Sequence, residues 1–404
     1  MSGALADIRV FDLSRILAGP TCTQIMGDLG AEVIKVERPG VGDDTRKWGP
    51  PYLKDKDGQD TAESAYYLAI NRNKRSITLD ITKPEGQELA LRLIEQCDVL
   101  IENFKVGDLA RRGLAYEQLR QRFPRLVYCS ITGFGQTGPY KERPGYDYLA
   151  QAMGGIMSVT GDVDGRPMKV GVAIADIMTG MYATTAILAA LRHRDATGAG
   201  QHIDMALFDS QLAWLANVGQ GYLISGEEPP RLGNDHPTVV PYGVFGAADG
   251  PFVLGVGNDA QFRRFCEFSA TPELADDKRF ATNASRVRNR AALIPLIEGA
   301  IARHPMRYWI EGLKKVGVPA APINTVAQAF ADPQAKHRGM VREIDHPLSD
   351  KPLPMTANPI RMSRTPVEYR HAPPTLGQDT EGVLADVLGI GAAEVAELRK
   401  RKIV

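Results

Sequence analysis

Short apolar segments alternate with helical segments over the first 135 residues, and this alternation restricts the fold more than any other feature of the chain. The connections between the segments are short, which favours parallel neighbouring strands. Alternating strands and helices are typical of a doubly wound, Rossmann-like α/β layer. Helices are expected at residues 18–30 and 83–97, and strands at "IRVFDLS" (8–14), "AEVIKVE" (31–37), "SITLDIT" (76–82), "DVLIENF" (98–104) and "LVYCSITGFG" (126–135).

Later segments break this pattern and indicate a second, smaller α+β domain. Residues 41–66 are polar and rich in Gly, Pro and Asp, so we expect a long surface loop. Residues 176–194 read as a buried central helix. The Pro-rich stretch 227–243 is a candidate linker, and a hairpin follows with its turn at Asp249-Gly250. We expect a large α/β domain over 1–225, a small domain over 226–325, and a return to the large domain with a C-terminal helix over 326–404.

The charge balance excludes several classes of partner. The 404 residues contain 48 Lys and Arg and 48 Asp and Glu, so no global field favours nucleic acid or an anionic membrane. The four cysteines are far apart and form no CxxC pair, which argues against a zinc site or disulfide framework and favours a reducing, cytoplasmic compartment. The N-terminus does not read as a signal peptide, and no uninterrupted apolar run approaches the ~18 residues of a membrane span.

One acid, Asp176, stands in the apolar run "VGVAIADIMTGMY" (170–182). A carboxylate there is costly to bury unless it is paired, hydrogen-bonded or used. It can be the N-cap of the helix that follows, because Asp is a favoured cap. It can also be a nucleophile that forms a covalent acyl intermediate, with the helix dipole favouring its charged form. The two roles are compatible, and the residues alone leave both open.

Other motifs are weaker. Residues 133–138, "GFGQTG", match GxGxxG, but loop residues follow instead of a helix, so a glycine turn is the better interpretation. No HxxxH or GxSxG spacing supports a metal or a nucleophile elbow. Basic residues near strand ends are either a solvated surface or a phosphate site at the carboxyl edge of the sheet. They are Arg38, Arg72, Lys74, Arg75, Lys105, Arg111 and Arg112.

Several long motifs occur in an order that resembles the class III coenzyme A transferases, the family of formyl-CoA transferase and carnitine CoA-transferase. They are "DLSRILAGP", "GDLGAEVIKVERPG", "NRNKRSITLD", "SITGFGQTGP", "PGYDYLAQAMGG" and "VGVAIADIMTGMYA". The resemblance spans nearly the whole chain. It implies a doubly wound large domain built from both chain ends, an inserted smaller domain, and an interlocked homodimer. It also implies that Asp176 attacks an acyl-CoA thioester, with CoA as a substrate and no tightly bound cofactor or metal.

Positions in the family motifs imply where CoA binds. The turn before the first helix, the ends of the second, third and fourth strands, and the "GYD" turn should contact it. The implied residues are Leu17, Ala18, Arg38, Leu79, Asn103, Phe104, Lys105, Arg111, Gly145, Tyr146 and Asp147. Formyl-CoA transferase has a glutamine where Leu17 stands here.

The segments around residues 233–245, 255–265 and 322–334 are similar to the succinyl-CoA:glutarate transferase branch. This similarity implies succinyl-CoA as donor and a dicarboxylate as acceptor, with His236, Tyr242 and Arg231 as candidate acceptor contacts. The alternative within the fold is an α-methylacyl-CoA racemase, which needs a histidine where Tyr146 stands. A phenol with an ordinary pKa near ~10 is a poor substitute. A non-catalytic CoA-binding protein is the third hypothesis.

Overall fold

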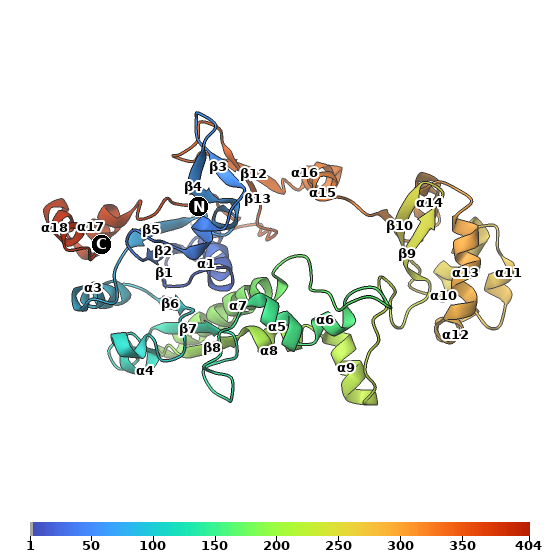
Figure 1. Cartoon of the computed structure of the whole chain (residues 1–404), viewed down its shortest axis with the longest axis horizontal. Helices are drawn as coiled ribbons and strands as arrows, with labels where there is room; N and C mark the ends of the chain where they lie inside the picture. Colours follow the sequence, from blue (N-terminus) through green and yellow to red (C-terminus); the bar gives the residue numbers. More distant parts are fainter. Residues whose placement is uncertain (1–2) are drawn as a thin grey trace. The chain divides into compact units, whose positions relative to one another are not determined.

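Six parallel strands form the central sheet of the computed structural model, which describes residues 3–404 (Figure 1). Their order is β5-β2-β1-β6-β7-β8, which is the 3-2-1-4-5-6 order of doubly wound sheets. The parallel α/β layer expected from the sequence is therefore confirmed. The strands are β1 (Arg9–Asp12), β2 (Glu32–Glu37), β5 (Lys74–Thr78), β6 (Val99–Glu102), β7 (Val127–Thr132) and β8 (His202–Ala206).

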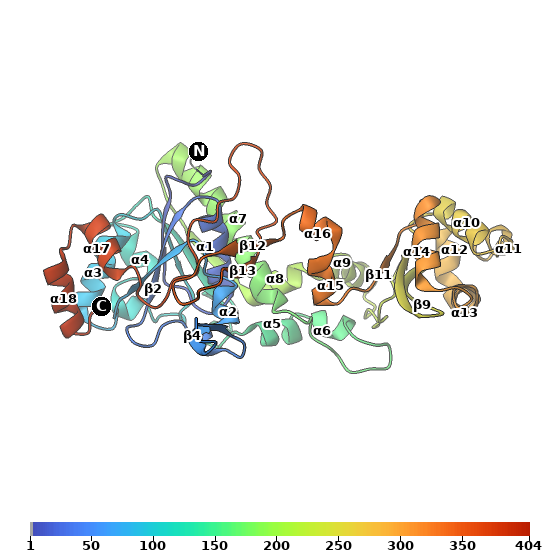
Figure 2. The ribbon, with the colours of Figure 1, turned by 90° about the horizontal axis from the view of Figure 1, so that it is seen from above.

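Alternate strand residues bury against helices on opposite faces of this sheet. Phe11 and Leu100 pack in the cluster with α3 (Pro84–Ile94), α17 (Thr380–Leu388) and α18 (Ala392–Lys400). Val10, Val33 and Val99 pack in another cluster, with α1 (Ala18–Asp28) and α7 (Ile174–Thr197). Because side chains alternate across a strand, nearly continuous apolar runs serve both faces. The C-terminal helices α17 and α18 lie beside α3, far away in the sequence (Figures 1 and 2).

Helix α7 packs along α1 on one face of the sheet (Figures 1 and 2). A Cβ added at Gly180 would lie 2.6 Å from the carbonyl oxygen of Ala18, so the missing side chain permits this close approach. By length and composition alone α7 could also cross a membrane, although it is not an uninterrupted apolar run. Half of its most apolar stretch is buried in the protein, and its neighbours show it to be a core helix here.

Residues 41–66 are not the irregular loop that their composition predicted. They contain η1 (Asp44–Lys47), the antiparallel pair β3 (Tyr52–Lys54) and β4 (Asp60–Ser64), and the start of α2 (Ala65–Leu68). Buried Arg46 holds this segment by binding the carboxylates of Glu37 and Glu63, each at 2.7 Å. Ion pairs across 9 and 17 positions, which local composition does not encode, order the segment.

The contacts divide the chain into two compact units. The first comprises the chain up to Ile156, Lys169–Ser225 and Gln334–Val404. It also contains η2 (Ala110–Arg112), α4 (Tyr116–Leu119), α5 (Asp147–Met153), α6 (Ile156–Val159, whose last three residues fall in the second unit), α8 (Leu207–Ala213), α9 (Ala216–Ser225), α16 (Pro333–His337, whose first residue falls in the second unit) and the pair β12 (Val341–Ile344) and β13 (Leu353–Thr356).

The second unit comprises Met157–Met168 and Gly226–Pro333. Its sheet joins β11 (Ala320–Pro322), β10 (Gly250–Gly255) and β9 (Tyr242–Ala247) in antiparallel order. The predicted hairpin is confirmed, with Gly250 at a positive φ where the second strand begins. The sheet buries its core against helices. These are α10 (Asp259–Phe268), α11 (Glu273–Asp276), α12 (Asn283–Arg288), α13 (Arg290–Ile301) and α14 (Met306–Lys315); α15 (Val326–Ala331) completes the unit.

Candidate active site

Asp176 is the third residue of α7, so the expectation that it is the N-cap is wrong. Ala173 occupies the N-cap position, and its methyl side chain cannot accept a hydrogen bond from the helix N–H groups. The cap comes from α5 instead: Oδ1 of Asp147 accepts the backbone N–H groups of Ala175 at 2.8 Å and of Asp176 at 3.2 Å. Asp147, which the family resemblance implied as a CoA contact, therefore closes the N-terminus of the helix that carries Asp176.

Asp147 is itself held in place by Gln151, one turn later on α5. Nε2 of Gln151 donates to Oδ2 of Asp147 at 2.7 Å, and its Oε1 accepts the N–H of Val170 at 2.8 Å. The "GYD" turn at the start of α5 packs against Gly133, the first glycine of "GFGQTG". A Cβ added at Gly145 would lie only 2.0 Å from the Cα of Gly133. Both glycine turns thus position Asp147, and GxGxxG opens no helix, as predicted.

Burial controls the charge of Asp176. Asp176 is only 9% exposed. Burial, together with the nearby Asp147 carboxylate, raises the pKa of the Asp176 carboxyl group to about 7. We expected the helix dipole to favour the charged form; desolvation and the like charge outweigh it. The carboxyl group is therefore poised between its neutral and nucleophilic forms near neutral pH.

The N-terminus of α1 lies beside the second turn of α7. Gly180, which touches Ala18, is one turn after Asp176 and on the same helix face. Leu17 and Ala18 are buried there, and no side chain caps α1. The amides of the first turn of a helix have no intrahelical acceptor. The uncapped start of α1 thus contacts α7 one turn from Asp176, and uncapped N–H groups of this kind can bind an oxyanion.

Tyr66 is a site residue that sequence reasoning missed, because it stood in the segment read as a loop. Burial and the carboxylates of Asp176, Asp147 and Asp43 raise its pKa to about 12, so the phenol stays protonated and can donate a hydrogen bond. Its ring meets Trp48 edge-on, with centroids 5.2 Å apart. Three aromatic residues in a polar, Gly- and Pro-rich stretch, Trp48, Tyr52 and Tyr66, were the only local signal.

A pocket of about 260 Å³ lies at the carboxyl edge of the sheet, beyond β1, β2, β5 and β6. Ligands bind at this edge in doubly wound folds. Arg38, Leu79 and Phe104, three of the implied CoA contacts, line it, as do Arg15 and Arg112. The guanidinium groups of Arg15 and Arg112 each lie over the Phe104 ring, 5.7 and 5.8 Å from its centroid. The edge thus joins cations to an aromatic face.

The remaining implied contacts do not line this pocket. Lys105 is exposed beside a separate pocket of about 280 Å³, and Arg111 pairs with Asp108. Tyr146, at 59% exposure, is the N-cap of α5. The side chain of Asn103 bonds the backbone of Arg15.

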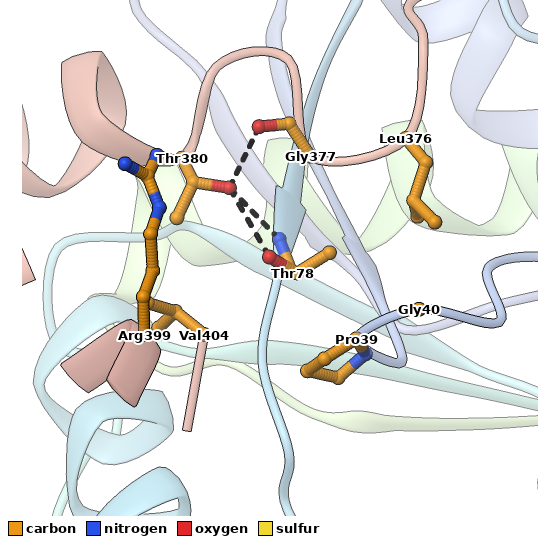
Figure 3. A pocket seen from close by; sticks show the side chains of 8 residues that line it. All are labelled: Pro39, Gly40, Thr78, Leu376, Gly377, Thr380, Arg399 and Val404. Atoms are coloured by element: carbon orange, nitrogen blue, oxygen red, sulfur yellow. Dashed lines mark hydrogen bonds between the residues drawn. The ribbon is translucent and has the colours of Figure 1, made fainter. Parts of the chain in front are cut away.

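A neighbouring pocket of about 290 Å³ opens where β5 meets the C-terminal helices (Figure 3). The hydroxyl of Thr380 accepts the N–H of Thr78 at 3.1 Å and donates to the carbonyl of Gly377 at 2.8 Å. Arg399 on its wall already faces Glu381 at 3.7 Å. The polar groups on the wall of this pocket thus bind other residues of the protein, and we assign the pocket no part in the chemistry.

The prediction of a phosphate site is wrong for three of its basic residues. Arg72, Lys74 and Arg75 come just before or at the start of β5, so they lie at the amino edge of the sheet, opposite the pocket. Arg72 is buried and forms a salt bridge with Asp28 at 2.6 Å, and buried Lys74 forms one with Asp12 at 3.3 Å. A basic residue before a parallel strand and one after it reach opposite edges, which the sequence clustering concealed.

The three candidate acceptor contacts belong to the second unit. Arg231 donates to the carbonyl oxygens of Gly165 at 2.6 Å and Asp162 at 3.3 Å. The rings of His236 and Tyr242 lie 5.2 Å apart, and Tyr242 lines a pocket of about 520 Å³. His236 and Tyr242 thus form one cluster, and the contact of these three residues with a substrate stays a prediction.

Comparison with known proteins gives one consistent result. The family model for CoA-transferase family III matches residues 5–380. A succinate–glutarate CoA-transferase of Agrobacterium fabrum is 50% identical over 95% of this chain and 95% of its own length. The human succinyl-CoA:glutarate CoA-transferase is 42% identical over 99% of this chain and 90% of its own length. The crystal structure of a CAIB/BAIF family protein from Brucella suis matches with a TM-score of 0.84 and 48% identity, covering 96% of this chain and all of that one.

Proposed function

Because this chain belongs to CoA-transferase family III, we propose that it moves CoA from succinyl-CoA to a dicarboxylate such as glutarate through a covalent intermediate on Asp176. The observation that supports this most directly is a buried carboxyl group with a pKa of about 7 beside uncapped helix amides. A family III enzyme transfers CoA between two carboxylic acids, and a direct exchange needs activation of a carboxylate. A covalent carrier divides that barrier into smaller ones.

The steps balance without an external reagent. The ionised Asp176 attacks the thioester carbonyl, the C–S bond breaks, and a mixed anhydride and CoA thiolate form. The thiolate attacks the aspartyl carbonyl and releases the donor acid, leaving an aspartyl-CoA thioester. The acceptor carboxylate attacks that thioester and expels the thiolate again. The thiolate then attacks the acceptor's carbonyl, which yields the new acyl-CoA and regenerates Asp176.

The carboxyl-edge pocket supports binding of the nucleotide end of CoA. Phosphate oxygens prefer forked guanidinium donors, and an aromatic ring near two arginines suits a base. Arg38 is exposed at the end of β2 and lines this pocket. In this proposal the pantetheine arm runs past Leu17 and Ala18 toward Asp176. Lys105, Arg111 and Gly145 then contact CoA from the rim. No metal or tightly bound cofactor takes part in these steps.

We also propose that the large domain carries the second unit as an insert and that two chains interlock in a homodimer. Support comes from α9, which buries none of its residues in this chain although it is strongly apolar. Its Leu223 and Ile224 are 75% and 78% exposed. Apolar surface of this kind usually marks an interface. The acceptor's second carboxylate is proposed to meet Arg231, His236 or Tyr242, and the protein to work in the cytoplasm.

The test is intact-protein mass spectrometry after mixing with succinyl-CoA, with hydroxylamine to trap an activated carboxyl group. A wild-type adduct or hydroxamate on Asp176 that is missing in Asp176→Ala supports the carrier role. Asp209→Asn, an exposed acid in the first turn of α8, is the matched control and should keep the adduct. A panel of dicarboxylate acceptors then ranks the substrates. No adduct, with exchange of the α-proton of a 2-methylacyl-CoA, would replace this proposal with the racemase.

A further inference from the structure

Gln151 connects Asp147 to the chain segment that leads into α7. The side chain of Gln151 is fully buried. Its Nε2 donates to Oδ2 of Asp147 at 2.7 Å and to the carbonyl oxygen of Val172 at 3.5 Å, and its Oε1 accepts the N–H of Val170 at 2.8 Å. One amide therefore holds a carboxylate of its own helix and also two backbone groups that lie 19 and 21 positions further along the chain.

Asp147 extends this hold to the residue that reacts. Its Oδ1 accepts the backbone N–H groups of Ala175 and Asp176, at 2.8 and 3.2 Å. The two oxygens of Asp147 thus have different partners, Gln151 on one side and the first turn of α7 on the other. Asp147 is only half-buried, so its carboxylate can turn toward water when Gln151 no longer binds it. The backbone of Asp176 is therefore held in place only while Asp147 stays bonded to Gln151.

The position of Asp147 also matters because its charge acts on Asp176. Together with burial, the Asp147 carboxylate raises the pKa of Asp176 to about 7. Tyr66 on α2 interacts electrostatically with both acids. The remaining titratable groups on the elements packed against α7 add no comparable shift; they are Cys22 and Asp28 on α1, Tyr148 on α5, Tyr128 and Cys129 on β7, His202 and Asp204 on β8, and Asp209 on α8. Because the interaction between two charges weakens with their distance, whatever fixes Asp147 also controls the charge of Asp176.

We propose that Gln151 is a positioning residue for the acylation of Asp176: by binding Asp147 and the backbone at Val170, it fixes both the start of α7 and the carboxylate whose charge acts on Asp176. This inference rests on the proposed function and extends it to a residue that acts through Asp147. A glutamine with a purely structural role would change the stability of the protein and leave the pH dependence of acylation as it is. A positioning residue changes that pH dependence.

The test is single-turnover acylation of Asp176 by succinyl-CoA, followed by rapid quench and mass spectrometry at a series of pH values and succinyl-CoA concentrations. Gln151→Glu keeps the acceptor for the Val170 N–H but places a further carboxyl group against Asp147. The midpoint of the pH–rate profile at saturation should therefore rise by about one unit. Gln151→Met removes every hydrogen bond of the amide, so the saturated rate at alkaline pH should fall roughly 10-fold. The half-saturating succinyl-CoA concentration should change by less than about twofold in both variants.

Two other glutamines provide matched controls. Gln24 of α1 is buried, and its amide also bonds two backbone groups of a distant segment, so Gln24→Met removes equivalent bonds elsewhere. Gln87 of α3 donates to a backbone carbonyl oxygen on the opposite face of the sheet, so Gln87→Glu makes the same change of charge there. Neither side chain bonds Asp147, and neither variant should move the midpoint or the saturated rate.

Hydrogen–deuterium exchange without substrate checks the geometry directly. The peptide covering residues 169–177 should exchange faster in Gln151→Met than in wild type, while exchange in β7 stays unchanged and shows that the variant is folded. If the methionine variant does not fold, the isosteric glutamate variant decides.

An unmoved pH midpoint in Gln151→Glu, or wild-type kinetics in a folded Gln151→Met, would make this glutamine purely structural and overturn the inference. A raised half-saturating concentration with an unchanged saturated rate would overturn it as well. Absence of a wild-type adduct would refute the proposed function itself, which is distinct from a wild-type adduct with unaffected variants.

Discussion

Asp176→Asn should make the protein more stable at neutral and alkaline pH while it abolishes acylation. Burial and Asp147 raise the pKa of this carboxyl group from its ordinary 3.8 to about 7. Each unit of such a shift corresponds to about 1.4 kcal/mol, so keeping Asp176 ionised in the folded protein costs on the order of 4 kcal/mol. Asparagine has nearly the same shape and no charge to bury.

The sign of the pH dependence follows from proton binding. The folded state holds the Asp176 proton more tightly than the unfolded state does, so wild-type stability falls as pH rises from about 4 to about 7. The asparagine variant has no such proton. Its advantage should be near zero at pH ~4, about 1.5 kcal/mol at pH 5, and about 4 kcal/mol at pH 8.

Urea unfolding at pH 5, 6.5 and 8, at one fixed protein concentration, measures this advantage. Asp209→Asn is the matched control, because it makes the same change at an exposed first-turn position of α8, and it should stay within about 0.5 kcal/mol of wild type at each pH. A variant that is no more stable than wild type at pH 8, or an advantage that does not grow with pH, would refute the reasoning about burial of Asp176.

Three further perturbations test neighbouring contacts. Asp147→Asn removes one of the two causes that raise the pKa of Asp176, so the midpoint of the pH–acylation-rate profile should fall by about one unit; an unmoved midpoint would assign the shift to burial alone. Gly180→Ala places a Cβ 2.6 Å from the carbonyl oxygen of Ala18 and should cost about 1–3 kcal/mol in urea unfolding; a neutral result would mean that α7 moves freely. Lys35→Met leaves a buried carboxylate unpaired and should cost about 3–5 kcal/mol by thermal unfolding, unlike Lys54→Met on an exposed pair.

The strands could be predicted because their signal is local. Segments such as "AEVIKVE" are apolar on both faces and end at turn residues, which is how a strand covered on both sides must read. Asp176 was found for a similar reason: a single acid in an apolar run is visible without any structure. The ordered motifs then placed the chain in its family, and the matching family model confirmed that.

Residues 41–66 failed as a prediction because their order depends on Arg46 binding Glu37 and Glu63, and turn-rich composition conceals such pairing. The basic residues failed for another reason. Arg72 and Arg38 both flank strands, but only a residue at the carboxyl end of a parallel strand reaches the pocket. Sequence clustering shows which residues are present and not the edge of the sheet at which they emerge.

By itself the sequence indicated the strands of the parallel sheet and singled out Asp176, because both are encoded by patterns of neighbouring residues. Only the tertiary structure decided that Asp147 caps the helix of Asp176 from 29 positions away and that Asn103 holds Arg15 across 88. The charge of Asp176 was decided there too, since burial and a like charge from another helix set its pKa. Desolvation and long-range hydrogen bonds exist only once the chain has folded, and no spacing along the sequence records them.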